Sequence, residues 1–247
     1  MSDLLQKASP AARSGRGGVG EPRRCPIPTP RFPWKDEELQ AFREELGRVL
    51  NEVYAPQVDR WSAQGFADPG AWRDLGELGF LLPELPERYG GADAHLGFPV
   101  AMQQVLVDHD VPSTLAVHTI VAHYLLDHGT EAQRERWLPS MASGERLGAI
   151  AMTEPDAGSD LKALRTTARR EGDHYVIDGA KTFITSGSTC GLLVVACRTG
   201  GPGAKGVSLL VVEDPLEQPG YTVGRRLQKI GLHLRRALHR HVKRHRR

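Results

Sequence analysis

The decapeptide AMTEPDAGSD, residues 151–160, is the most informative stretch of this 247-residue chain. Pro155 has no N–H group and lets the chain turn, and Gly158 allows another group to approach the backbone closely. Ser159 and Asp160 are short polar residues that could cap a following helix, or their N–H groups could bind an anion. Taken alone, the stretch therefore predicts either a binding loop or an ordinary surface turn.

A second informative stretch, KTFITSG, follows at residues 181–187. Its aromatic residue, Phe183, offers a flat apolar face that suits a planar ring. Thr185 comes two residues later, so its hydroxyl would lie on the same side of a strand. The alternative is a β-strand, residues 181–185, whose single aromatic residue belongs to the core.

The first half of the chain has the periodicity of helices. Apolar residues recur at three- and four-residue steps after Trp34: Leu39, Phe42, Leu46, Val49, Leu50 and Val53. Acidic residues at positions 36–38 suit a first helical turn, where the helix dipole favours negative charge. Further helices are expected at about residues 69–78, 98–108, 113–128 and 131–141. Thr130 is the expected N-cap of the last helix, and the Pro- and Gly-rich residues 81–91 should form a loop.

After Gly144 the pattern changes to short β-branched segments separated by Gly and Pro. The expected strands are residues 147–150, 166–169, 175–177, 181–185, 192–198, 207–212 and 221–223. The sequence Glu171-Gly172-Asp173 is a hairpin turn signal between the second and third of them. We therefore expect an α+β fold, in which an N-terminal helical domain precedes an antiparallel β-barrel or sandwich.

The composition is typical of a soluble globular protein, with 40% hydrophobic and 25% charged residues. No apolar run approaches the ~18–20 residues that a membrane-spanning helix needs. The three cysteines, Cys25, Cys190 and Cys197, have neither metal-binding nor redox spacing. No HExxH motif exists, and His118, His123 and His128 are expected to be ordinary helical residues. These features predict no metal site, free thiols in a reducing compartment, and a cytoplasmic protein.

Both ends of the chain differ in composition from its middle. Residues 1–33 are rich in Pro, Gly, Ser and Arg, and we expect them to be disordered because they can bury little apolar surface. A transit peptide is the alternative there, and it would place the protein in the mitochondrial matrix. Residues 232–247 hold seven Arg or Lys and no acid, so the rest of the chain has 25 basic and 30 acidic side chains. A nucleic-acid partner would have to bind that tail alone, and none is expected.

Four segments resemble the acyl-CoA dehydrogenase family, and they occur in the family's order. TEPDAGSD, residues 153–160, is similar to the signature T-E-P-x-A-G-S-D, and residues 181–187 resemble K-x-[WF]-I-[TS]-[NS]-G. ELGFLLPELPERYGG, residues 77–91, looks like the family segment that ends in P-E-x-Y-G-G. HGTEAQRERWLPSMASGE, residues 128–145, looks like the run that contains G-T-E-x-Q and A-S-G-E. The resemblance covers about residues 34–231.

This resemblance implies a domain organisation. Residues 34–146 would be the family's N-terminal helical domain, and residues 147–231 its β middle domain without the last strand. The family's C-terminal helical bundle, which carries the catalytic glutamate and the core of the homo-oligomer, has no counterpart in these residues, so no catalytic residue is named. After KIGLH, residues 229–233, the basic segment 232–247 departs from the family. We expect a frameshift or a truncation there, the alternative being a genuine basic tail that binds nucleic acid or an anionic membrane.

The resemblance also implies FAD as the cofactor. Met152 and Thr153 would lie near the flavin, with the Thr153 segment meeting the isoalloxazine. Gly158 and Ser159 would lie at the flavin pyrophosphate, and Ser159 would also approach the acyl-CoA. Ile150 departs from those members that carry Tyr at this position, which removes a phenol from the site.

The second motif completes the implied site. Phe183 would stack beside the flavin, where many members have Trp, and Thr185 would form a hydrogen bond near flavin N5. The implied reaction is the α,β-dehydrogenation of an acyl-CoA thioester, as in fatty acid β-oxidation, with electrons passed to an electron-transfer flavoprotein. Two alternatives stay open: a non-catalytic fragment that binds FAD or acyl-CoA weakly, and a flavin oxidase or monooxygenase of the same fold.

Overall fold

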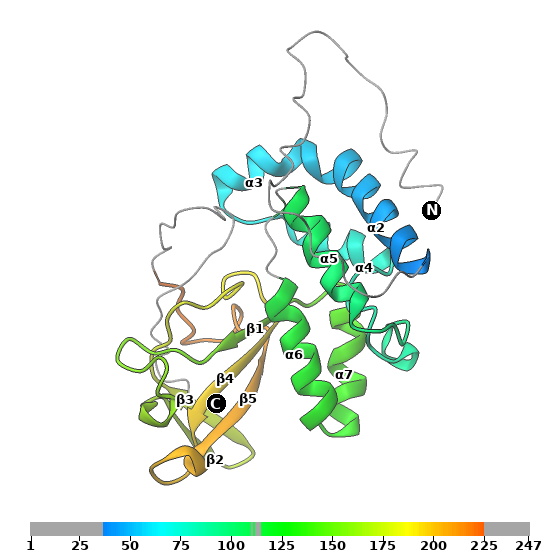
Figure 1. The fold of residues 1–247 in the computed structure, drawn as a ribbon. Helices are drawn as coiled ribbons and strands as arrows, with labels where there is room; N and C mark the ends of the chain where they lie inside the picture. The colour runs from blue at the N-terminus through cyan, green and yellow to red at the C-terminus, as the bar shows by residue number, and fades with distance from the viewer. Residues whose placement is uncertain (1–36, 110, 112–114, 225–247) are drawn as a thin grey trace.

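The computed structural model describes residues 37–109, 111 and 115–224, and the expectations for residues 1–33 and 232–247 lie outside them. Along the described chain the helices come first and the strands follow, which confirms the expected order. Figure 1 shows the first helices gathered at one end of the molecule and the sheet at the other. None of the helices in these residues is long and apolar enough to cross a membrane.

The expected helices are confirmed with small shifts of their ends. They are α2 (Glu37–Val49), α4 (Pro69–Glu77), α5 (Gly97–Asp108), α6 (Leu115–His128) and α7 (Glu131–Ala142). A short helix that we did not expect, α3 (Val58–Gln64), lies between α2 and α4. Thr130 caps α7 as expected, because its hydroxyl accepts a hydrogen bond from the Gln133 N–H while the Gln133 side chain accepts one from the Thr130 N–H. Gly65 ends α3 in the left-handed conformation, with a φ of 84°.

The stretch after α2 is not a regular α-helix. A π-helical turn, Leu50–Tyr54, follows α2, and a 3-10 turn, Ala55–Gln57, leads into α3. A π-helical turn closes over one more residue than an α-helical turn, so it shifts the side chains that follow. Val53, which we expected on the apolar face, is 42% exposed, and Tyr54 is fully buried in its place.

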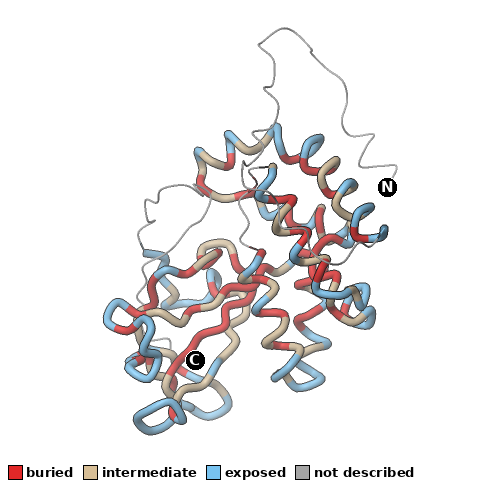
Figure 2. Tube along the Cα trace, in the orientation of Figure 1, coloured by how far each residue is buried: buried red, intermediate tan, exposed pale blue. Residues whose placement is uncertain are grey.

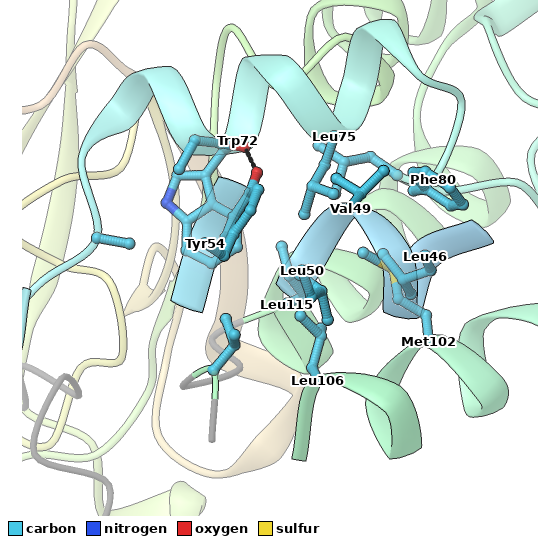
Figure 3. Close-up of a cluster of buried hydrophobic side chains, with 14 of the residues drawn as sticks. Leu46, Val49, Leu50, Tyr54, Trp72, Leu75, Phe80, Met102, Leu106 and Leu115 are labelled. Atoms are coloured by element: carbon cyan, nitrogen blue, oxygen red, sulfur yellow. Dashed lines mark hydrogen bonds between the residues drawn. The ribbon is translucent and has the colours of Figure 1, made fainter. Parts of the chain in front are cut away.

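Tyr54 anchors this turn in the core of the helical half. Its ring packs edge-on against Trp61 with 5.4 Å between the ring centroids, and its hydroxyl donates a hydrogen bond to the Ala71 carbonyl in α4. The surrounding cluster in Figure 3 includes Leu46, Leu50, Leu75, Phe80, Met102 and Leu106. These side chains hold α2, α4 and α5 together by burial of apolar surface.

The β half is a mixed sheet. Its strands are β1 (Gly148–Ala151), β2 (Thr167–Glu171), β3 (His174–Asp178), β4 (Leu192–Arg198) and β5 (Val207–Glu213). β4 pairs antiparallel with β5 on one edge and parallel with β1 and β2 on the other, and β2 pairs antiparallel with β3. The expected antiparallel pairing therefore holds for two of the four pairings. Residues 152–191 carry the chain back so that β4 starts at the same end as β1, and Figure 2 shows β4 buried along most of its length.

β1 and β2 follow each other along the same edge of β4. β1 pairs with residues 192–195 of β4, and Thr167 at the start of β2 pairs with Arg198. The motif AMTEPDAGSD begins at the end of β1 and continues into the excursion that the chain makes between these two strands. Both ends of that excursion are therefore fixed by β4.

Two of the expected strands were wrong. Residues 181–185 form a loop, because Phe183 and Ser186 both have a φ of 58°, a left-handed conformation that an extended strand excludes. Residues 221–223 do not form a strand either, because only Tyr221 takes part in a β-bridge there; its hydroxyl donates to the Gly187 carbonyl at 3.0 Å. The hairpin turn between β2 and β3 is confirmed, with Gly172 at a φ of 67°.

His118 joins α6 to α7 and to the sheet. Its Nδ1 accepts a hydrogen bond from the Gly148 N–H at the start of β1 over 3.0 Å, and its Nε2 lies 3.2 Å from the Met141 carbonyl. These partners require the neutral ring with its proton on Nε2. Burial lowers the pKa of His118 to about 4, so the ring is neutral at pH 7. The sequence pattern, which we interpreted as that of an ordinary helical histidine, did not reveal this connection.

Candidate functional site

The two motif segments lie side by side. The first loop, residues 152–166, connects β1 to β2, and the second loop, residues 179–191, connects β3 to β4. The Thr182 N–H donates a hydrogen bond to the Thr153 carbonyl over 2.8 Å. Segments that are separate in the sequence therefore form one surface.

A buried ion pair fastens the two loops together. Lys181 of the second loop donates from Nζ to Glu154 Oε1 and to the Met152 carbonyl, both at 2.9 Å. The Lys181 side chain is 2% exposed and the Glu154 side chain 5%. Glu154 also accepts hydrogen bonds from the N–H groups of Arg165 (2.7 Å) and Thr166 (2.9 Å) at the far end of the first loop. One carboxylate thus connects the beginning of the first loop, its end, and the second loop.

This environment keeps Glu154 ionised. Burial alone would raise its pKa, but hydrogen bonds from Thr166, Arg165 and Lys181 lower the pKa to about 2. Burial lowers the pKa of Lys181, and the hydrogen bond and charge of Glu154 oppose that change. A carboxylate with so low a pKa is a weak base, so Glu154 is unsuited to removing a proton from a substrate.

Phe183 is exposed although its neighbours in the chain are buried. It is 64% exposed, whereas Lys181 and Thr182 before it and Ile184 after it are buried. Its φ of 58° lies in the left-handed region, which costs roughly 1–2 kcal/mol for a residue with a Cβ. Strain of this kind persists only where surrounding contacts fix it, and it is common at binding sites.

Gly158 and Ser159 lie on the exposed turn of the first loop. A Cβ at Gly158 would meet open space, and its φ is not positive, so packing within the chain does not require a glycine there. Among the described residues, the N–H groups of Gly158 and Ser159 have no hydrogen-bond partner. Asp160 caps the short 3-10 helix Leu161–Ala163 by accepting a hydrogen bond from the Lys162 N–H at 3.1 Å. The turn therefore uses Asp160 as a cap and leaves two N–H groups available to a ligand.

The other expected site residues, Met152, Thr153 and Thr185, are each partly buried. The carbonyls of Met152 and Thr153 bind Lys181 and Thr182, so the structure brings this backbone directly against the second loop. Their roles toward a cofactor, like those of Gly158, Ser159 and Phe183, stay predictions.

Glu213 at the end of β5 is also held in ion pairs. Its carboxylate lies 2.9 Å from Arg136 Nε and 3.8 Å from Arg146 Nη1. Burial would raise the pKa of Glu213, but the hydrogen bond from Arg136 and the charges of both arginines lower it. Like Glu154, this residue is a poor candidate for a catalytic base.

Sequence reasoning missed the connection between Lys181 and Glu154. Lysine and glutamate are rarely buried, so neither periodicity nor composition indicates that these two side chains meet in the core. The only signal was their place inside the two motifs. That signal indicates that both residues belong to the site, but it does not predict the ion pair between them.

Comparisons with known protein families cover most of the chain. Residues 36–145 match the model described as acyl-CoA dehydrogenase, N-terminal domain, and residues 149–243 match the model described as acyl-CoA dehydrogenase, middle domain. The second match continues past residue 231, where we expected the resemblance to end.

Individual proteins give the same result. The mitochondrial long-chain specific acyl-CoA dehydrogenase of Mus musculus is 34% identical over 200 residues, which are 79% of this chain and 46% of that protein. Acyl-CoA dehydrogenase FadE29 of Mycobacterium tuberculosis is 40% identical over 195 residues, which are 76% of this chain and 49% of that protein. The crystal structure of acyl-CoA dehydrogenase from Geobacillus kaustophilus has a TM-score of 0.78 at 40% identity, covering 85% of this chain and 56% of that one. The chain spans about half the length of the curated relatives it matches. Since both domains match in order and the fold is shared, the chain belongs to the acyl-CoA dehydrogenase family.

Proposed function

We propose that this chain binds FAD on the surface formed by the first and second loops, and that it serves the α,β-dehydrogenation of an acyl-CoA thioester. The observation that carries the proposal is the fastening of the two loops by Lys181 and Glu154, which holds the exposed Phe183 on the same surface as Thr153. When bound, FAD would supply the hydride acceptor that this chemistry needs.

The residues of both loops fit this cofactor. Phe183 exposes a flat apolar ring that can pack against the isoalloxazine, and Thr153 and Thr185 have hydroxyls that can form hydrogen bonds to it. The N–H groups of Gly158 and Ser159 can donate to the pyrophosphate, because an exposed turn with free N–H groups suits an anion. Met152 belongs to the same surface through its contact with Lys181. Ser159 is also the residue that we propose to contact the acyl-CoA.

The wider function is part of the same proposal. Family membership supports an acyl-CoA as substrate and an electron-transfer flavoprotein as electron acceptor, and we propose a cytoplasmic location. Glu154 and Glu213 are both held in ion pairs, so we assign neither of them as the proton acceptor. That observation favours a second candidate function, in which the described residues bind FAD and acyl-CoA without oxidising the substrate.

Absorbance spectroscopy separates these functions. The purified chain is mixed with FAD, passed over a gel-filtration column and examined for retained flavin. Acyl-CoAs of increasing chain length are then added without oxygen. Retained flavin that bleaches with one substrate class supports the dehydrogenase, and retained flavin that keeps its colour supports binding alone. A folded chain that retains no flavin contradicts both.

A further inference from the structure

We infer that Lys181 and Glu154 are positioning residues: their buried ion pair fixes the second loop so that Phe183 is held exposed toward the flavin. The inference rests on the proposed function, because it deepens the description of the same site. Neither residue is assigned a contact with the reacting atoms. Their effect on the ligand is exerted through the backbone that they hold.

The pair lies where it can control the conformation of Phe183. Lys181 is two residues before Phe183, and the intervening Thr182 N–H is bonded to the Thr153 carbonyl at 2.8 Å. On the other side, Ile184 is only 1% exposed. The strained phenylalanine is therefore held between two buried anchors. Without the Lys181 anchor, Phe183 could return to an extended conformation and turn its ring toward apolar surface. Both the release of its backbone strain and the removal of the apolar ring from water favour that change.

Glu154 gives this anchor a rigid base. It accepts a hydrogen bond from the Thr166 N–H, and the Thr166 carbonyl in turn accepts one from the Arg198 N–H of β4 at 2.7 Å. Gly179, at the start of the second loop, lies so close to Thr166 that a Cβ on it would be 2.4 Å from Thr166 Oγ1. The ion pair thus connects the second loop to the central strand of the sheet.

Stability alone does not explain why two charges are buried here. An apolar pair of similar volume commonly stabilises a fold as well as a buried ion pair does, since both charges lose their hydration. An ion pair with several hydrogen bonds does fix direction and distance, because each donor must meet its acceptor. The geometry therefore points to a positioning role beside the strained, exposed Phe183.

The test compares two variants of the full chain that each lose buried contacts. Lys181→Met keeps an unbranched side chain, one atom shorter than lysine, and removes its charge. Leu75→Ala removes a fully buried side chain from the core cluster of the helical half. FAD is titrated into each protein at a temperature at which circular dichroism shows all of them folded. We expect the Kd for FAD to rise about tenfold or more in Lys181→Met and to stay unchanged in Leu75→Ala.

Hydrogen exchange of the ligand-free chain provides a readout that does not depend on flavin. The Thr182 amide should exchange faster in Lys181→Met than in the unmodified chain, and Leu75→Ala should leave its protection unchanged. Equal FAD affinity in Lys181→Met and the unmodified chain, or an unchanged Thr182 amide, overturns the inference. If the unmodified chain takes up no FAD, the proposed function fails, and exchange at Thr182 still decides whether the pair holds the loop. If Lys181→Met does not fold, Glu154→Gln replaces it, because it removes the charge while its amide oxygen can still accept from one of the two N–H groups, that of Arg165 or that of Thr166.

Discussion

We expect the unfolding free energy of this chain to decrease as the pH is lowered from about 6.5 to about 4, because of His118. The pKa of His118 is about 4 in the folded protein, against an ordinary value of 6.5 in the unfolded chain. As the pH falls through 6.5, the unfolded chain binds a proton that the folded ring does not, so the unfolded state is favoured. The difference corresponds to about 3 kcal/mol of unfolding free energy, which is present above pH 6.5 and lost by about pH 4.

The structure supplies the reason for this low pKa. Nδ1 of His118 accepts from the Gly148 N–H at 3.0 Å, so a proton on Nδ1 would oppose another donor and break that bond. His118→Asn provides a variant without titration at this position, because its Oδ1 can still accept from the Gly148 N–H. The variant removes the His118 contact with the Met141 carbonyl, which still accepts from the Gly144 N–H at 3.1 Å, so the loss at neutral pH should be about 1 kcal/mol.

Urea unfolding followed by circular dichroism, at several pH values between about 4 and 8, measures both effects. The unmodified chain should lose about 3 kcal/mol more than His118→Asn between the two ends of this range. The stability curve of the unmodified chain should therefore fall toward that of His118→Asn and then below it as the pH falls. Parallel curves would refute the reasoning, because the titration of His118 would then contribute nothing to the pH dependence.

Two further substitutions test the loops. Lys181→Met should lower the unfolding free energy by about 3 kcal/mol. This value is at the lower end for a broken buried ion pair, because Glu154 keeps two backbone donors. In the same urea assay, Lys162→Met at an exposed position should change the unfolding free energy by less than about 0.5 kcal/mol, and equal losses in the two variants would contradict the role of the buried pair. Gly158→Ala should change the unfolding free energy by less than about 0.5 kcal/mol, since its Cβ meets open space, and it should weaken FAD binding. Its control is Gly172→Ala, which should lower the unfolding free energy by about 1 kcal/mol, because Gly172 has a φ of 67°, and should bind FAD normally. Thermal unfolding and FAD titration of both glycine variants check this, and unchanged FAD affinity in Gly158→Ala would remove that turn from the site.

Local patterns predicted the helices well. Periodicity placed α4 to α7 within two residues, and the T-x-x-Q pattern at Thr130 corresponds to a complete capping box. The pattern failed at Val53, because a π-helical turn moved Tyr54 into the core. That turn is stabilised by the contacts of Tyr54 with Trp61 and Ala71, and the apolar periodicity of the sequence does not show these contacts.

The β half and the site depended more on tertiary contacts. β-branched runs located β4 and β5, but composition does not show that β4 pairs in parallel with β1. The motif KTFITSG has the composition of a strand, and only the anchors on both sides of Phe183 force the left-handed backbone there. The motifs indicated which residues belong to the site. The ion pair of Lys181 with Glu154 required the folded chain, because it joins residues from different loops.

The most direct test of the central claim, that these two loops form a flavin site, is a fluorescence titration of FAD against the full chain, Phe183→Ala and Tyr175→Ala. Tyr175 on β3 is the matched control, since it is an exposed aromatic residue outside both loops. The account predicts equal binding by the unmodified chain and Tyr175→Ala, and binding weaker by about tenfold in Phe183→Ala, since the ring contact is lost. Equal FAD affinity for all three folded proteins would contradict it.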